Sequence, residues 1–148
     1  MFAAWPAQAA VRVAVADFDY DDSSGEVRQE TAEHAKFVTA LKADIVKAIA
    51  DAGGFSTETL RCGAKTCSGD SLDQAEMTRA AKAQDARFIV FGGVHKVSTL
   101  IQWGQIEVMD TQTGQTKLSR TVSFRGDDAD AWQHAGSYIG QMVVDALK

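Results

Sequence analysis

The spacing of apolar residues predicts a strand at the start of the chain. Residues 11–19, VRVAVADFD, place Val11, Val13 and Val15 on one face of an extended segment, and the other face carries Ala14, Ala16 and Phe18. Since both faces are largely apolar, we expect an inner strand of a sheet. Residues 20–27 are polar and contain a glycine, so they are expected to form a loop.

Three later segments have the spacing or the end signals of helices. Residues 31–52 carry apolar side chains every three to four positions, and paired glycines end the segment. A short Ala-rich helix is expected to begin at a capping box formed by Ser71 and Gln74. A last helix, capped by Asp127 or Asp128, continues towards the C-terminus with a similar apolar stripe.

The remaining apolar runs predict four further strands, at residues 55–60, 86–97, 99–110 and 115–124, with a tight turn at 111–114. The last three strands form a meander. The resulting order predicts an α+β fold, in which helices pack on a mixed sheet of about five strands. Residues 11–148 are expected to form one domain.

The charge balance excludes some classes of partner. The 148 residues include 15 Lys and Arg against 20 Asp and Glu, which gives a net charge of -5 and a pI near 5.1. No basic stripe is available to neutralise phosphates, so nucleic acid and anionic membrane surfaces are not expected as partners. No apolar run is long enough to span a bilayer.

Residues 1–10, MFAAWPAQAA, are set apart from the domain. The small residues of AQA followed by Ala10 are typical of a signal-peptide cleavage site. We therefore expect a residual signal-peptide tail, and the alternative is a disordered N-terminus. The first interpretation predicts a soluble periplasmic protein secreted through an N-terminal signal peptide, because no lipid-accepting cysteine lies near the site.

The two cysteines agree with export. Cys62 and Cys67 lie in a loop of small residues, CGAKTC, and in an oxidising compartment they are expected to form a disulfide. A redox-active pair is the alternative. It is the weaker one, because four residues separate the two thiols instead of the usual two.

The segment VAVADFDYDDSSGEVRQE, residues 13–30, concentrates negative charge. Six carboxylates face a single arginine there: Asp17, Asp19, Asp21, Asp22, Glu26 and Glu30. Hard cations take several oxygen ligands at about 2.3–2.6 Å, and a strand end followed by a Gly-containing turn can direct several carboxylates to one point. The alternative is a solvated acidic loop with ordinary turn and cap chemistry.

The metal hypothesis assigns a role to each of these side chains. The expected ligands are Asp19, Asp21, Asp22 and Glu26. Glu30 and His34, which lies one helical turn later, are expected in the outer shell, and Asp17 is expected to be structural. A highly charged ion offsets so many like charges better than a weakly charged one, so a hard, highly charged metal ion is expected.

Catalytic chemistry is not expected. The three histidines lie in different elements, and no nucleophile elbow or nucleotide-binding glycine pattern is present. His34 and His134 are expected as exposed helix residues, and His95 as a structural strand residue. Trp103 is expected in the core or on ordinary sheet surface, with a partner contact as the alternative.

Several motifs together resemble a known family. They are VAVADFDYDDSSGE, DARFIVFGGVHKVSTLI, the pair Cys62 and Cys67, and IEVMDTQTGQTKLSRTVSFRGDDADAWQHAGSYI. The resemblance covers most of residues 11–147. It is to a family of small exported bacterial proteins with a domain of unknown function, which includes landiscernin, a periplasmic lanthanide-binding protein. The layout is also similar to curli-secretion and TolB N-terminal envelope domains.

The resemblance implies a function without catalysis. It implies a periplasmic metallochaperone that captures a lanthanide(III) ion reversibly, with calcium as a weak competitor. Transfer would be to lanmodulin or another periplasmic lanthanide protein, and metal-bridged homodimers are a further expectation. The alternative is an envelope interaction or assembly module of the curli-secretion and TolB type that binds no metal.

Overall fold

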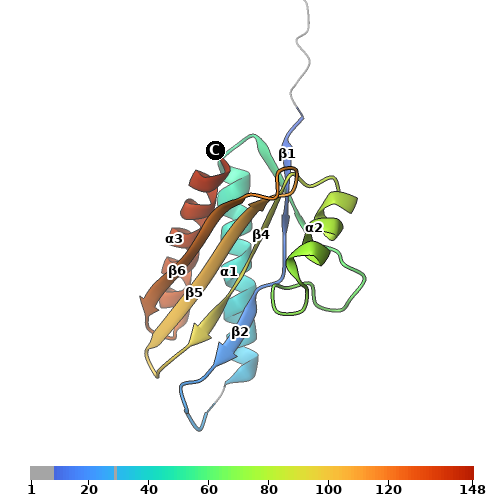
Figure 1. Cartoon of the computed structure of the whole chain (residues 1–148). Helices are drawn as coiled ribbons and strands as arrows, with labels where there is room; N and C mark the ends of the chain where they lie inside the picture. The colour runs from blue at the N-terminus through green and yellow to red at the C-terminus, as the bar shows by residue number, and fades with distance from the viewer. Residues whose placement is uncertain (1–8, 29) are drawn as a thin grey trace, which may run out of the picture.

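The computed structural model describes residues 9–28 and 30–148, and it confirms the α+β fold. Three helices pack on a six-stranded mixed sheet (Figure 1). The elements, in chain order, are β1 (Val11–Val15), β2 (Asp19–Asp22), α1 (Thr31–Asp51), β3 (Phe55–Thr59), α2 (Gln74–Ala83), β4 (Phe88–Lys96), β5 (Ile101–Asp110), β6 (Thr116–Arg125) and α3 (Ala129–Leu147). The predicted signal-peptide tail or disordered terminus lies outside the described residues, except for Ala9 and Ala10.

The first predicted strand is divided into two. The sheet order is β3-β1-β4-β5-β6, so β1 is an inner strand as expected. β1 ends at Val15, and β2 begins at Asp19 and pairs in parallel with the later part of β4. The prediction of a loop from residue 20 is therefore wrong for Tyr20–Asp22, which lie in β2. Between the strands, Asp17 forms a parallel bridge with Ser68 of the cysteine loop instead.

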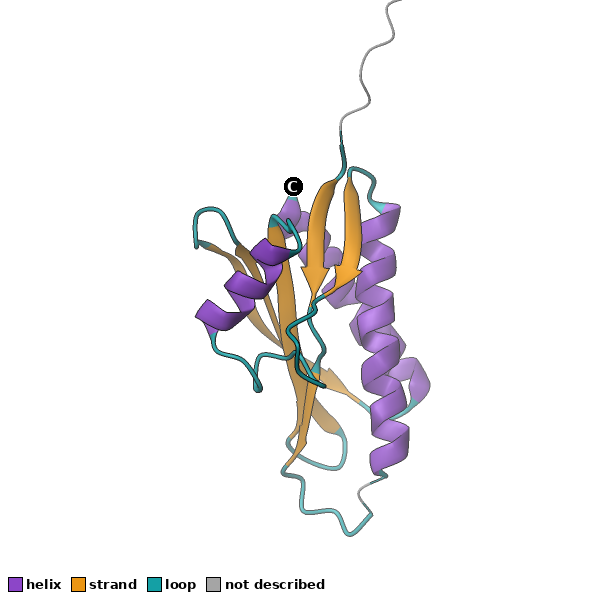
Figure 2. Cartoon of the chain, turned by 90° about the vertical axis from the view of Figure 1, so that its right-hand side faces the viewer, coloured by secondary structure: helices purple, strands orange, loops and turns teal. Residues whose placement is uncertain are grey.

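The helices cover the two faces of the sheet unequally. Figure 2 shows the long helices α1 and α3 on one side of the sheet and the short α2 on the other. The larger core lies under α1 and α3, where buried residues such as Leu41, Ile45 and Ile139 meet the strands. Gly140 lets the two helices approach closely, because a Cβ atom there would lie 2.9 Å from the Cβ of Ala48.

A smaller core lies beneath α2, with Met77, Ala81 and Ile89 among its buried members. α2 contacts β4 and covers only part of this face. The remainder of the face, over β2 and the adjoining parts of β4, β5 and β6, carries no helix (Figures 1 and 2). We call this area the open face. No helix in the described part of the chain combines the length and the apolar character needed to cross a membrane.

The structure decides the predicted N-caps of two helices and the pairing of the two cysteines. Asp128 caps α3 by accepting a hydrogen bond from the Ala131 N–H at 2.9 Å, one of the two predicted alternatives. The capping box at Ser71 is wrong, because Asp73 caps α2 through the Glu76 N–H. The Ser71 hydroxyl instead accepts a hydrogen bond from the Ser68 N–H within the loop. Cys62 and Cys67 form the expected disulfide.

Candidate functional site on the open sheet face

The alternation of side chains along β2 divides the acidic cluster between the two faces of the sheet. Asp19 and Asp21 point to the open face, where both line one pocket. Tyr20 and Asp22 point to the opposite face, and the Tyr20 ring stacks on His34 of α1 with ring centroids 4.6 Å apart. Since successive strand residues point in opposite directions, the predicted ligands on β2 do not converge as one set.

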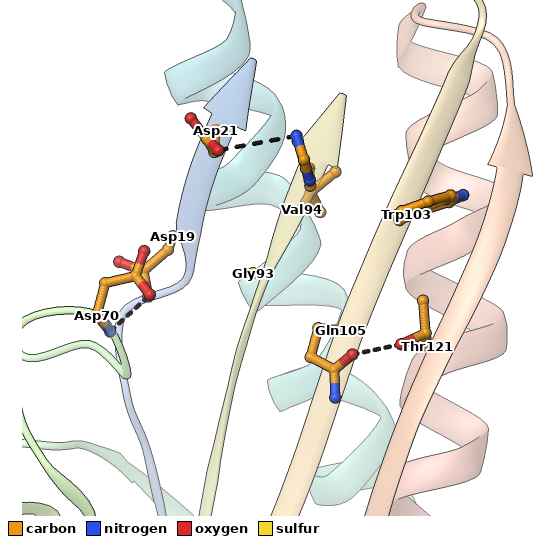
Figure 3. A pocket seen from close by; sticks show the side chains of 9 residues that line it. Asp19, Asp21, Asp70, Gly93, Val94, Trp103, Gln105 and Thr121 are labelled. Atoms are coloured by element: carbon orange, nitrogen blue, oxygen red, sulfur yellow. Dashed lines mark hydrogen bonds and ion pairs between the residues drawn. The ribbon is translucent and has the colours of Figure 1, made fainter. Parts of the chain in front are cut away.

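The pocket on the open face has a volume of about 330 Å³. Figure 3 shows its walls, which come from β2, β4, β5, β6 and the loop that follows the disulfide. The lining residues are Asp19, Asp21, Asp70, Gly93, Val94, His95, Trp103, Gln105 and Thr121. We call this the open-face pocket. It combines three carboxylates with the Trp103 indole, the His95 imidazole and the polar side chains of Gln105 and Thr121.

Asp19 occupies the partly buried side of the open-face pocket. Its Oδ2 atom accepts a hydrogen bond from the Asp70 N–H at 3.0 Å, and burial raises the pKa of the carboxyl group. Gly93 allows β2 to lie this close to β4, because a Cβ atom at Gly93 would be 2.7 Å from the Asp19 carbonyl oxygen. The glycine in the FGGV segment therefore serves close strand packing.

His95 joins β2 to the aromatic side of the pocket. Its Nε2 atom lies 2.6 Å from the Ser23 hydroxyl oxygen and 3.8 Å from Asp21 Oδ2. Its ring is edge-on to Trp103, with centroids 6.2 Å apart. A serine–histidine–acid relay needs the acid and the serine on different ring nitrogens, so this arrangement is not a catalytic triad.

Asp22 and Glu26 do not line the open-face pocket, and both have other partners. Asp22 Oδ1 accepts hydrogen bonds from the Ser24 hydroxyl at 2.6 Å and from the Ser24 N–H at 2.9 Å, and these bonds lower its pKa. Glu26 Oε2 lies 2.6 Å from the Lys96 ammonium. Glu30 is exposed at the start of α1, in the left-handed backbone region with φ of 37°, and lines a separate cavity with Glu26.

His34 is buried, contrary to the prediction of an exposed helix residue. It is 2% exposed, and its Nε2 atom lies 2.8 Å from Asp127 Oδ2. Asp127 also accepts hydrogen bonds from Lys96 and from the Trp132 indole N–H. Burial alone would raise the pKa of Asp127, but these partners lower it. The sequence predicted the apolar face of this helix, but it gave no indication that the Asp127 carboxylate would pair with a buried His34.

Asp17 has the structural position expected of it. Its carboxylate accepts hydrogen bonds from the Cys67 N–H at 3.2 Å and from Lys42 at 3.1 Å. Burial acts to raise its pKa, and these two partners lower it below the ordinary value. Asp17 thus links the break after β1 to the cysteine loop.

No group of three or more His, Cys, Asp or Glu side chains in residues 9–28 and 30–148 is arranged to hold a metal ion. The lanthanide site stays a prediction. Sequence reasoning missed Asp70 and gave His95 a structural role. It placed Trp103 in the core or on ordinary sheet surface, with a partner contact as the alternative. A sequence signal for an exposed Trp103 was present, because the tryptophan shares one face of β5 with the polar residues Gln105 and Glu107. In the structure the tryptophan is 47% exposed.

Known structures share this fold at low sequence identity. TolB from Acinetobacter baumannii matches with a TM-score of 0.61 and 14% identity, over 95% of this chain and 29% of that chain. The PelC dodecamer from Paraburkholderia phytofirmans matches with a TM-score of 0.56 and 15% identity, over 95% of this chain and 91% of that chain. Lipoprotein GNA1162 from Neisseria meningitidis matches with a TM-score of 0.56 and 10% identity, over 93% of this chain and 99% of that chain.

These likenesses establish a shared fold, and the chain spans less than a third of the length of the TolB chain. No curated protein matches the sequence. A family model matches residues 11–142, and its description is "Protein of unknown function (DUF2380)". Because the match extends over most of the chain, the protein belongs to this family, DUF3280.

Proposed function

We propose that this protein is a non-enzymatic interaction module of the bacterial envelope, which works by binding another protein. The observation that carries the proposal is the shared fold. It extends over 93% or more of this chain in TolB, in a PelC dodecamer and in a protein named as a lipoprotein. One of these proteins assembles with copies of itself, so the fold is compatible with protein–protein assembly.

The open face supports the same proposal. Its pocket presents an exposed tryptophan among polar side chains. Aromatic residues of this kind are enriched where proteins bind one another. The hydrogen bond between Ser23 and His95 lacks the relay geometry of a hydrolase, so binding fits the site better than catalysis does.

The proposal is tested by the cellular compartment in which the protein is found and by its native size in an extract of the source bacterium. The chain is produced from its own promoter, released by osmotic shock, and compared by gel filtration with purified protein of 15.9 kDa. We expect recovery in the periplasmic extract, in a complex larger than the purified chain. Recovery only in the cytoplasm, or a native size equal to that of the purified chain, would contradict the proposal.

A second candidate function is reversible capture of a lanthanide(III) ion, as in landiscernin. Three carboxylates from two segments, those of Asp19, Asp21 and Asp70, line the open-face pocket and favour this function. In this version water or a second protein molecule completes the coordination, because Asp22 and Glu26 have other partners. Lanmodulin would receive the ion, and calcium would compete weakly.

The metal candidate is tested by a terbium titration in excess calcium. Trp103 lies in the same pocket and would sensitise the emission of a bound ion. The lanthanide candidate predicts saturable emission that Asp19→Asn with Asp21→Asn abolishes, and a change in size at half saturation if the metal bridges two chains. Absence of a saturable response by emission and by calorimetry would remove this candidate.

A further inference from the structure

The open-face pocket has the chemistry of a site for a cationic side chain. Three carboxylates line it, and the lining includes no lysine or arginine. Asp21 is well exposed, with 76% of its side chain accessible, whereas Asp19 is partly buried and hydrogen-bonded to the Asp70 N–H. The pocket therefore has one carboxylate held by a backbone hydrogen bond and one, that of Asp21, which is exposed and lies 3.8 Å from His95 Nε2.

Trp103 adds an aromatic surface two strands across the sheet from Asp21, with His95 of β4 between them. His95 contacts the tryptophan edge-on, and Ser23 in turn holds His95 through a hydrogen bond of 2.6 Å. An aromatic face attracts a cation that lies over it, and the attraction increases where water is excluded. A ligand that uses both features must be long enough to pass over His95 from the ring to Asp21.

We propose that the open-face pocket binds an arginine side chain from an extended segment of a partner protein. This inference rests on the proposed function and names the chemistry of the partner. A planar guanidinium stacks on an aromatic ring and donates paired hydrogen bonds to a carboxylate, whereas a lysine ammonium is a compact, strongly hydrated charge. The pairing of flat ring and carboxylates in one pocket therefore favours arginine.

The size and position of the pocket specify an extended segment. A volume of about 330 Å³ accommodates one long side chain and its neighbours but not a folded element. Gln105 and Thr121, which are hydrogen-bonded to each other across β5 and β6, form a flat polar floor next to the tryptophan. A backbone lying over this floor places one side chain towards Asp19 and Asp21.

The inference is tested by NMR titration of the isotope-labelled, disulfide-intact chain with a seven-residue peptide of alternating serine and arginine. We expect saturable shifts at the Trp103 indole N–H and at the amides of Gly93 and Gln105. A matched peptide with citrulline in place of arginine keeps the shape and loses the charge. We expect it to bind at least tenfold more weakly.

Variants separate the two parts of the site. Replacing both Asp19 and Asp21 with Asn should weaken binding of the arginine peptide at least tenfold. Trp103→Ala should weaken it about 3- to 10-fold, the range expected for loss of one partly exposed cation–aromatic contact. Lanthanum chloride serves as a second probe, because metal coordination would not depend on the indole ring.

Matched controls lie on the helices of the opposite face. Asp51→Asn with Asp145→Asn removes the same charge as the pocket double variant, and Tyr138→Ala removes another exposed aromatic ring. Both controls should bind like the original chain. The inference is overturned if the citrulline peptide binds equally well, if Trp103→Ala has no effect, or if the charge control weakens binding as much as the pocket variant does.

The native-size experiment distinguishes this inference from the proposed function. A large complex that forms with the original chain and is lost with Trp103→Ala supports both. A large complex that persists unchanged with Trp103→Ala overturns the arginine site and leaves the interaction module in place.

Discussion

Lys96 shows how a single residue connects the acidic loop to the core. Its side chain is 3% exposed, yet carboxylate oxygens of Glu26 and Asp127 each lie 2.6 Å from its ammonium group. Burial alone would lower the pKa of Lys96, but these two partners raise it, so the residue stays charged. Part of the acidic segment therefore compensates a buried cation, and its presence does not require a metal ion.

Lys96→Met is expected to lower the free energy of unfolding by about 3–5 kcal/mol, because it leaves Asp127 and Glu26 without their shared cation. Urea unfolding at neutral pH measures the change. Lys47→Met is the control, since Lys47 is 73% exposed and pairs only with Asp51 on the surface of α1. Its unfolding midpoint should remain close to that of the original chain. Equal losses in the two variants would contradict a structural role for the buried network.

The Arg87–Asp110 pair predicts a pH dependence of stability. The side-chain hydrogen bonds from Arg87 hold the pKa of Asp110 at about 2. Because the folded-state pKa is depressed, the ionised form stabilises the protein above the unfolded pKa near 3.9, and this contribution is lost as the pH falls towards 2. Asp110→Asn should flatten the unfolding free energy between about pH 4 and pH 2. An unchanged slope there would contradict the assignment.

At the scale of elements, β2 determines where the acids lie. Local sequence signals predicted all three helices and the other five strands, because most of these elements have a clear apolar pattern and α2 is rich in alanine. It missed β2, since DYDD is polar and its pairing with Gly93–Lys96 joins segments far apart in sequence. The predicted N-cap of α2 was wrong for a related reason. Ser71 and Asp73 are both good caps, and only the loop geometry decides between them.

Gly93→Ala is expected to loosen β2 without altering any charged residue. The new methyl group would lie 2.7 Å from the Asp19 carbonyl oxygen, so β2 must move away from β4. We expect a loss of about 1–3 kcal/mol in unfolding free energy, the range for overpacking. Amide exchange should become faster in Asp19–Asp22 and remain slow in β5. Unchanged protection of β2 would contradict the close packing described here.

At the scale of the whole molecule, the helices leave part of one face of the sheet uncovered. α1 and α3 cover one face of the sheet and α2 part of the other, which leaves the open face with its pocket (Figure 2). The pocket joins residues that are distant along the chain, such as Asp19 with Asp70, separated by 51 positions. Single-sequence reasoning found the acids of β2, but it had no means of placing Trp103, His95 and Asp70 beside them.

The most direct test of an interacting open face is photo-crosslinking in the source bacterium. A photoreactive phenylalanine analogue replaces Ser123, which pairs with Trp103 across β5 and β6, and in a second strain it replaces Tyr138 on α3. We predict discrete adducts with a protein from position 123 that disappear when Asp19 and Asp21 are both Asn, and no such adducts from position 138. Absence of adducts from position 123, or the same adducts from both positions, would contradict the account.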